Sequence, residues 1–334
     1  MTRALVTGAN GFIGSALCRH LSELGWKIRA AVRGRTPPSL GSAACEYCSV
    51  GDIHGQTDWE SALNDIEVVV HLAARVHVLR ERAQNPLAEF IRVNTAGTER
   101  LASQAAFLGV RRLVYVSSIA VNGQSTRPGQ MFAEEDDPRP ADPYGLSKLG
   151  AESVLSAIAA RSALEVVIIR PPAVYGPDLR GHLRTLLSYV HRGIPLPLAN
   201  IRNRRSFISL DNLCRFLSLC STHPSAVGQT FLLADERAIS TPELYTLLSE
   251  GMGRRPRLYP LPEPVLRFSC SLCGLQNIHR RLCHSLVIDC GKATRVLDWH
   301  APNSVEDGLE RTAKWYIQNV QQREKEAKQE CLVR

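Results

Sequence analysis

Residues 4–14 read Ala-Leu-Val-Thr-Gly-Ala-Asn-Gly-Phe-Ile-Gly, a short apolar run that leads into three glycines spaced three residues apart. The residues that follow, up to 24, have the apolar spacing of one helix face. Glycines between a strand and a helix let the backbone approach a pyrophosphate, and the helix N-terminus offers it free N–H groups. The stretch therefore predicts a dinucleotide-binding turn formed by Gly8, Gly11 and Gly14.

Strands and helices alternate through the rest of the first half of the chain. Residues 68–74, Val-Val-Val-His-Leu-Ala-Ala, are apolar enough to form a central strand of a parallel sheet. Alternation of this kind predicts right-handed crossovers and a doubly wound parallel sheet of the Rossmann type. The expected strands are 4–8, 27–32, 68–74, 113–117 and 166–169, and the expected helices are 13–24, 86–108 and 143–161.

The pattern loosens after Pro171-Pro172, where prolines interrupt shorter elements. We interpret this part as a smaller mixed α/β substrate-binding lobe, so the fold class is α/β. The expected domains are a dinucleotide-binding domain over 1–172, the lobe mainly over 173–322, and a frayed charged tail over 323–334. The lobe is expected to hold strands at 207–210, 230–233 and 258–261, helices at 182–192, 211–221 and 241–251, and a last helix at roughly 305–328.

Composition is that of an ordinary soluble globular protein. The 334 residues carry a formal net charge of +8, but the arginines are spread along the chain. This disfavours a nucleic-acid partner and is explained equally well by an anionic small-molecule ligand. The N-terminus enters a strand at once, and the chain has no continuous apolar run of about 18 residues, so we expect a cytoplasmic protein with no membrane span.

The ten cysteines are scattered and are expected to be reduced thiols. Cys270, Cys273 and Cys283 lie near His279 and His284, but this cluster lacks the second paired clip of a common zinc finger. A partly buried helix with small apolar thiols explains the cluster better. We therefore expect no metal, and whether these cysteines do anything beyond packing stays open.

The end of the strand expected at 27–32 bears on the choice between NAD and NADP. A site for NAD usually has an acidic residue there, which accepts hydrogen bonds from the adenosine ribose. Here the strand leads into Arg33, whose guanidinium can bind a 2′-phosphate. We expect NADP(H) to be favoured and NAD(H) to be possible; alternatively, Arg33 only covers the adenine. Asp52, at the end of a further expected strand, is expected to meet the adenine edge.

Tyr144 and Lys148 are four residues apart on an expected helix, so their side chains share a face. A nearby ammonium and an oxidised nicotinamide both favour the phenolate, which lets Tyr144 exchange a proton with a hydroxyl or a carbonyl oxygen. Ser118, in the pair Ser117-Ser118, would hydrogen-bond the same oxygen, and Lys148 would hold the nicotinamide ribose. We expect hydride transfer at a carbinol carbon, with Ser118, Tyr144 and Lys148 as catalytic residues. An ordinary amphipathic helix is the alternative reading.

Together these motifs resemble the extended short-chain dehydrogenase/reductases, the NAD-dependent epimerase/dehydratase family that acts on nucleotide sugars. The resemblance is almost continuous in the first half and looser in the second. The matching stretches are TGANGFIG at 7–14, VGDI at 50–53, HLAA at 71–74, VNTAGT at 93–98, VSS at 116–118, PYGLSK at 143–148, RPPAVYGP at 170–177 and RRSFISLD at 204–211.

The resemblance implies roles for further residues. Arg204 matches a family arginine that meets the substrate diphosphate, and Arg281 is implied as a second, with Arg280 as the alternative. Tyr175 is implied to line the nicotinamide pocket and to contact the substrate, as Ser118 and Tyr144 do. Cofactor contacts are implied for Asn10, Phe12, Ile13, Ile53, Leu72, Ala73, Ala74, Asn94, Pro171 and Val174.

Three functions are compatible with these residues: two enzyme activities and a role without catalysis. The stretches 71–79 and 203–213 are similar to reductases and epimerase-like proteins of bacterial surface-polysaccharide (lipopolysaccharide O-antigen) biosynthesis. With Arg33, this similarity favours an NADP-dependent reductase of a UDP-4-keto-6-deoxy-N-acetylhexosamine. The alternatives are a UDP-hexose or UDP-N-acetylhexosamine 4-epimerase, and a catalytically silent NADP(H)-binding sensor that has kept the fold. The resemblance also implies a homodimer, paired through the helices at about 86–109 and 143–161.

Overall fold

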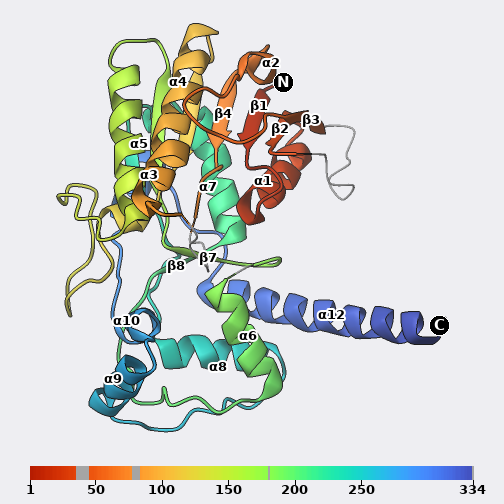
Figure 1. Ribbon diagram of the computed structural model, residues 1–334, viewed down its shortest axis with the longest axis vertical. Coiled ribbons are helices and arrows are strands. Elements are labelled where there is room, and N and C mark those ends of the chain that lie inside the picture. The colour runs from red at the N-terminus through yellow and green to blue at the C-terminus, as the bar shows by residue number, and fades with distance from the viewer. Residues whose placement is uncertain (35–44, 77–82, 180, 333–334) are drawn as a thin grey trace.

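A parallel sheet with helices on both sides organises the larger part of the molecule (Figure 1). The computed structural model describes residues 1–34, 45–76, 83–179 and 181–332. The strand order is β3-β2-β1-β4-β5-β6-β9, and each neighbouring pair is parallel. The strands are β1 Arg3–Thr7, β2 Lys27–Val32, β3 Cys45–Ser49, β4 Val68–His71, β5 Arg112–Val116, β6 Glu165–Arg170 and β9 Thr230–Leu232.

Side chains alternate between the two faces of this sheet, which gives it two separate cores. On β1, Ala4 and Val6 belong to one core and Leu5 to the other. The expected α/β class, with a doubly wound sheet of the Rossmann type, is therefore confirmed. The first face is covered by α1 Phe12–Glu23, α7 Leu210–Thr222 and α11 Gly291–Leu297, and the second by α2 Glu60–Leu63, α4 Gly97–Phe107 and α5 Pro143–Ala159.

A smaller mixed lobe is built around a third core. A parallel pair, β7 Ala173–Tyr175 and β8 Phe207–Ser209, lies between this lobe and the large sheet in Figure 1. The expected domain boundaries stay predictions, although α7, β9 and α11 return from the second half to the large sheet. The helices of the lobe are α6 His182–Arg192, α8 Thr241–Gly251, α9 Glu263–Leu272, α10 Gln276–Cys283 and α12 Val305–Leu332.

The helix expected over 86–108 contains an irregular segment. It consists of α3 Pro86–Phe90, a π-helix η2 Ile91–Ala96 and then α4. A π-helical turn is wider than an α-helical one and is frequent at functional sites. Here it carries Asn94, which is buried.

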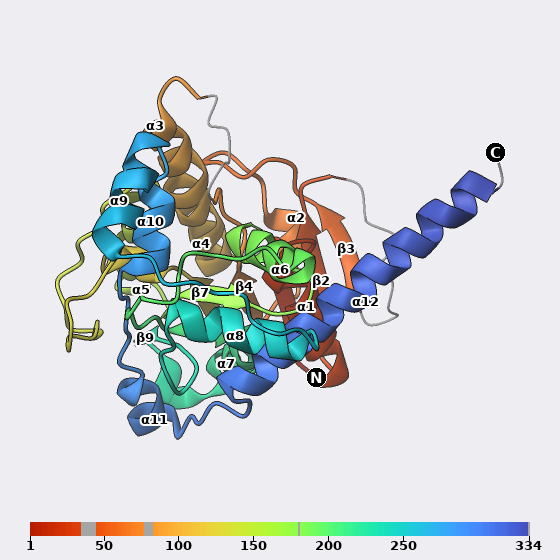
Figure 2. The same cartoon turned by 90° about the horizontal axis from the view of Figure 1, so that it is seen from below.

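One strand expected in the second half is absent from the structure described. The strand expected at 258–261 is reduced to a single bridge between Leu258 and Leu196, since three prolines in 256–262 remove the N–H donors of a longer ladder. The last helix, α12, is longer than expected and extends to Leu332, and whether its charged end frays stays a prediction. Figures 1 and 2 show this helix projecting away from the body of the molecule.

The described ranges, 1–34, 45–76, 83–179 and 181–332, show neither a membrane-spanning helix nor a metal-binding cluster. Among the helices there, none combines the length and the apolarity needed to cross a bilayer. Over the same ranges, no three His, Cys, Asp or Glu side chains are grouped so as to hold a metal ion. Cys270 and Cys283 pack half-buried against a small apolar cluster, whereas Cys273 is exposed.

Candidate active site

The glycine-rich turn lies between β1 and α1 at the carboxyl edge of the sheet. Gly8 has a φ of +64°, and a Cβ at this residue would lie 3.0 Å from the Cα of Ala73. A Cβ on Gly14 would lie 2.2 Å from the carbonyl oxygen of Gly8, so only glycine lets α1 approach the strand this closely. Gly11 precedes α1, and no side chain of the described residues caps the helix there. The turn therefore has the free backbone donors that a pyrophosphate requires.

The residues expected to contact the dinucleotide lie around this turn and along the same edge. Leu72 and Ala73 follow β4, and the backbone N–H of each donates to the Oγ1 of Thr7 at 3.1 Å. These two bonds hold the segment 72–74 beside the turn. Whether it contacts a dinucleotide stays a prediction. The exposed or half-buried residues along this edge are Asn10, Phe12, Ile13, Ile53, Ala74 and Val174.

Arg33 follows β2 and forms an ion pair with Asp52. Its Nε lies 3.0 Å from the Oδ1 of Asp52, and both side chains are exposed, so the pair contributes little to stability. The ion pair places the Asp52 carboxylate beside Arg33, at the end of β2, where the sequence segment itself has no acidic residue. A carboxylate there repels a 2′-phosphate, which counts against the expected preference for NADP(H).

Ser118, Tyr144 and Lys148 come together beside the carboxyl end of β5. Lys148 is buried, and its Nζ donates to the carbonyl oxygen of Val116 at 2.8 Å. The same Nζ lies 6.0 Å from the centre of the Tyr144 ring. Ser118, two residues after Val116, forms a hydrogen bond with the Tyr144 hydroxyl. β4 lies between β1 and β5, so this group and the glycine turn share one edge of the sheet.

Burial controls the acid–base properties of this group. It raises the pKa of Tyr144 to about 12, although the hydrogen bond from Ser118 acts in the opposite direction. Burial also lowers the pKa of Lys148 to about 7, against the opposing effect of the Glu152 carboxylate. The lowering of the Tyr144 pKa by the Lys148 ammonium, which we expected, is therefore not seen in the free protein. A more acidic phenol requires additional positive charge, of the kind an oxidised nicotinamide carries.

A buried ion pair that was not expected from the sequence supports α5. Glu152 lies one turn after Lys148, and its carboxylate accepts hydrogen bonds from the Nη2 of Arg170 at 2.6 Å and from its Nε at 3.0 Å. Ser117 donates to the same carboxylate, and the Nη1 of Arg170 donates to the Oδ1 of Asn122 at 2.9 Å. The pair fixes α5 to the end of β6. The available signal was an acid four residues after Lys148, on the same helix face.

Two residues implied by the resemblance are enclosed rather than open to a pocket. The amide of Asn94 is bonded to the backbone of Arg75 and to the Oγ of Ser147. Tyr175 is 1% exposed, and its hydroxyl donates to the Oδ2 of Asp235 at 2.6 Å. Pro171 is also buried. The structure therefore does not place Tyr175 on an open pocket wall.

Arg204 and Arg205 face opposite ways, because side chains alternate along an extended segment. Arg204 is exposed and lines, with Arg202 and Ser206, a cavity of about 880 Å³. Arg205 is half-buried, and burial together with the charge of Arg281 lowers its pKa to about 10. The arginine that lies near Arg281 is therefore Arg205, which the motif alone did not single out.

This arginine pair lies near the start of α5. Asp142 caps α5, accepting a hydrogen bond from Gly145, and its charge acts on Arg281. Gln124 donates to Asp142 at 2.9 Å and accepts a hydrogen bond from the Nη1 of Arg280 at 2.6 Å. Of the two arginines considered from the sequence, Arg280 is thus engaged by Gln124, and Arg281 interacts with Arg205.

Known proteins share both the sequence and this fold. Residues 4–234 match the model of the NAD dependent epimerase/dehydratase family. The chain is 38% identical over 316 residues to a UDP-glucose 4-epimerase of Vibrio cholerae, covering 94% of this chain and 95% of the relative. It is 28% identical to MoeE5, solved in complex with UDP-glucose and NAD, with a TM-score of 0.76 and coverage of 95% and 99% of the two chains. A UDP-glucuronic acid 4-epimerase of Bacillus cereus, solved with NAD, has the same fold at 22% identity, with a TM-score of 0.76 and the same coverage. The chain therefore belongs to the NAD dependent epimerase/dehydratase family.

Proposed function

We propose that this protein transfers a hydride to and from C4 of a UDP-sugar, as a 4-epimerase that keeps NAD bound between the two half-reactions. The observation that carries the proposal is the assembly of Ser118, Tyr144 and Lys148 on the sheet edge that also holds the glycine turn. The identity to the Vibrio cholerae UDP-glucose 4-epimerase supports the same class of reaction.

In this proposal two side chains handle the proton and the oxygen at C4. Tyr144 takes the proton of the C4 hydroxyl and returns it to the carbonyl oxygen in the reverse step. Ser118 hydrogen-bonds that oxygen and keeps it near the phenol. Lys148, held by the carbonyl of Val116, provides positive potential beside the Tyr144 ring and a donor for the ribose. When bound, the dinucleotide supplies the acceptor and donor of the hydride.

NAD rather than NADP is the cofactor of this proposal. Gly8, Gly11 and Gly14 would hold its pyrophosphate at the N-terminus of α1. Arg33 would cover the adenine, and the negative charge of Asp52 would disfavour binding of the 2′-phosphate of NADP. MoeE5, at 28% identity, was solved with NAD, which supports the assignment.

The substrate of this proposal carries a diphosphate, and guanidinium groups bind such a group well. Arg205 and Arg281 interact with each other near the capped start of α5, so an anion between them relieves their mutual repulsion. We assign binding of the diphosphate to Arg205 and Arg281. Arg205 thereby takes the role that was expected for Arg204. A UDP-sugar is the class that MoeE5 was solved with, which supports this choice.

A reductase of a 4-keto UDP-sugar is the second candidate, as the sequence first led us to expect. The observation that favours it is Arg33, which stands directly after β2, where an acidic residue usually marks an NAD site. A reductase exchanges its dinucleotide in every turnover, whereas an epimerase retains it. The fate of the dinucleotide therefore separates the two activities.

The test is to incubate the purified protein with UDP-GlcNAc, UDP-GalNAc, UDP-glucose and UDP-galactose without added cofactor. We expect interconversion of one pair, and release of NAD when the protein is denatured. Consumption of NADPH only with a UDP-4-keto sugar would instead establish the reductase. Dinucleotide binding without turnover in either assay would establish the silent sensor and overturn both enzyme assignments.

A Tyr144→Phe variant tests the chemistry itself. It should lose most of the rate, by about 10²–10⁴-fold, because it lacks the proton-transfer group, while its fold and dinucleotide affinity are kept. Tyr189→Phe is the matched control, since Tyr189 is a partly exposed tyrosine on α6. An unchanged rate in Tyr144→Phe would remove Tyr144 from the mechanism.

The homodimer implied by the family resemblance also stays a proposal. It would pair α4 and α5 with those of a second copy. Leu149 and Val154 are half-buried on α5 and supply apolar surface, whereas Ile158, expected to do the same, packs in the core. Sedimentation equilibrium of the wild type and of Val154→Glu would show whether this helix face holds two chains together.

A further inference from the structure

Two short helices of the lobe, α9 and α10, leave large apolar side chains uncovered. Phe268 is 65% exposed and Leu272 is 73% exposed. Together with Val265 they repeat at three and four residues along α9, which places them on one face of the helix. Leu275, just before α10, and Ile278, within it, are also exposed, at 42% and 40%. We call these five residues the apolar patch; large apolar side chains exposed close together in the chain are typical of interaction sites.

The patch lies in a basic part of the chain. Residues 254–284 contain six arginines and one acidic residue, Glu263, whereas the whole chain has a formal net charge of +8. Arg267 is exposed on α9, between Val265 and Phe268. The partner of the patch must therefore accept apolar side chains and guanidinium groups at the same place.

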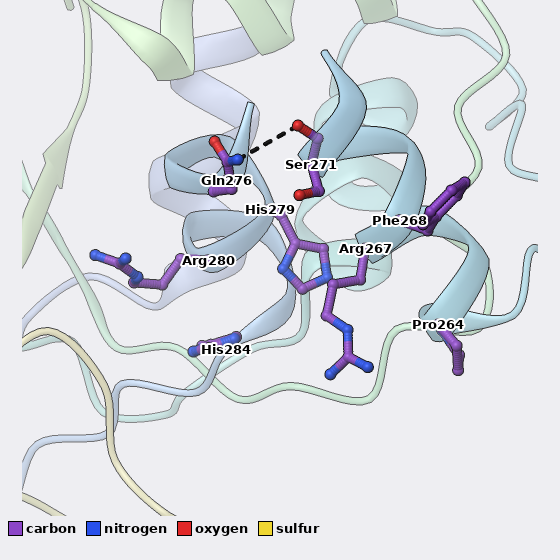
Figure 3. Close-up of a pocket in the computed structure, with 8 residues that line it drawn as sticks. All are labelled: Pro264, Arg267, Phe268, Ser271, Gln276, His279, Arg280 and His284. Atoms are coloured by element: carbon purple, nitrogen blue, oxygen red, sulfur yellow. Dashed lines mark hydrogen bonds between the residues drawn. The ribbon is translucent and has the colours of Figure 1, made fainter. Parts of the chain in front are cut away.

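A cavity of about 590 Å³ lies between the two helices (Figure 3). Arg267 and Phe268 from α9 and His279 and Arg280 from α10 help to line it. His279 is only 6% exposed, and its Nε2 has no hydrogen-bond partner within the described part of the chain, with Glu263 4.0 Å away. Figure 3 shows the ring of His279 reaching from α10 toward α9. The cavity thus offers cationic donors and an unused buried nitrogen to an anionic group next to the apolar patch.

We propose that α9 and α10 dock on the surface of a membrane that contains anionic phospholipid. The side chains of the apolar patch enter the boundary between headgroups and acyl chains, and the arginines bind the phosphates, one of which occupies the cavity beside His279. This is the arrangement of an interfacial amphipathic helix: an apolar face below and basic side chains at headgroup level. Helices of 10 and 8 residues are too short to span a bilayer, so they lie in its plane.

The charge of the patch favours a lipid surface over a second copy of the chain. Pairing two copies through α9 and α10 would bring Arg267 and Arg280 close to their own duplicates with only Glu263 to offset them, and like charges at an interface oppose association. An anionic bilayer can accept both the apolar side chains and the arginines of this surface. Figures 1 and 2 place α9 and α10 at an edge of the molecule, where a flat surface can reach them.

The test is sedimentation of the full chain with vesicles of equal parts phosphatidylglycerol and phosphatidylcholine, and with vesicles of phosphatidylcholine alone. We expect binding to the first, at least tenfold weaker binding to the second, and a decrease at high salt. Phe268→Glu and Leu272→Glu should each reduce binding at least tenfold, because each places a carboxylate in the apolar patch. Leu24→Glu is the matched control, since Leu24 is 54% exposed at the end of α1, outside the patch.

Two results would overturn the proposal. One is equal binding to both kinds of vesicle, or none, by the wild type. The other is a wild-type dimer that Phe268→Glu converts to a monomer in sedimentation equilibrium, since the patch would then be a protein interface. Dinucleotide binding by each variant verifies that it has folded, so loss of vesicle binding is attributed to the surface.

Discussion

The Nδ2 of Asn94 donates a hydrogen bond to the Oγ of Ser147, 2.9 Å away, in the buried interior. Asn94 lies on the π-helix η2, and Ser147 lies on α5 between Tyr144 and Lys148. The Oδ1 of Asn94 also accepts from the backbone N–H of Arg75 at 2.7 Å, in the segment that follows β4. The amide of Asn94 thus connects the segment after β4 with α5, the helix that carries the proposed base Tyr144 and the amine of Lys148.

Asn94→Ala should therefore slow the proposed reaction by about tenfold, since α5 loses a hydrogen bond at Ser147, between Tyr144 and Lys148. It should also lower the free energy of unfolding by about 1–3 kcal/mol, because buried partners are left without a hydrogen bond. Steady-state kinetics and urea denaturation measure the two effects. Thr95→Val, which removes only a bond to the Ser147 carbonyl, should have the smaller effect on kcat. Equal kcat in the wild type and Asn94→Ala would show that the amide does not position the helix.

Exchanging one arginine at a time tests the assignment of the diphosphate. Arg205→Gln should raise KM for the UDP-sugar by about tenfold to a hundredfold, because a charged hydrogen-bond partner of the diphosphate is lost. Arg204 lines the cavity of about 880 Å³ instead, so Arg204→Gln should change KM by less than about threefold. A larger effect at Arg204 would return the role to the residue indicated by the sequence.

The Arg33–Asp52 pair makes a prediction about cofactor choice. In Asp52→Asn the guanidinium keeps its place but loses the adjacent carboxylate, so the affinity for NADP should rise about tenfold relative to that for NAD. Titrations with both dinucleotides measure the ratio. Asp58→Asn serves as the control, because Asp58 is an exposed acid in the same region. An unchanged ratio in Asp52→Asn would mean that this carboxylate does not contribute to cofactor selection.

The features predicted from the sequence are those carried by short contiguous signals. The glycines of residues 8–14 and the apolar run at 68–74 each specify their own local structure, and their order specifies the parallel sheet. The strand before Asp52, which is β3, was expected without bounds, because its side chains are exposed or half-buried at the sheet edge and show no apolar run. The Glu152–Arg170 pair was missed for another reason: it joins a helix to a strand, and only the packed fold brings the two together.

The proposed catalytic site shows the same limit. The four-residue spacing of Tyr144 and Lys148 correctly indicated that they lie close together, since helix geometry alone determines it. The degree of burial around them was not readable from that spacing, and burial is the largest influence on both pKa values. The choice between Arg204 and Arg205 likewise depended on which face of an extended segment meets the neighbouring Arg281.

The buried amine of Lys148 predicts a pH dependence of stability. Its pKa falls from 10.5 to about 7 on folding, so between these values the unfolded chain holds a proton that the native protein does not. The native state should therefore gain stability as pH rises through this window, by up to about 1.4 kcal/mol per pH unit, and lose it as pH falls toward 7. Denaturation of the wild type and Lys148→Met at several pH values isolates this contribution as their difference. Lys314→Met, which removes an exposed lysine, should show no such slope. If the difference in free energy of unfolding between the wild type and Lys148→Met does not change with pH, the amine of Lys148 stays protonated in the native protein throughout this pH window.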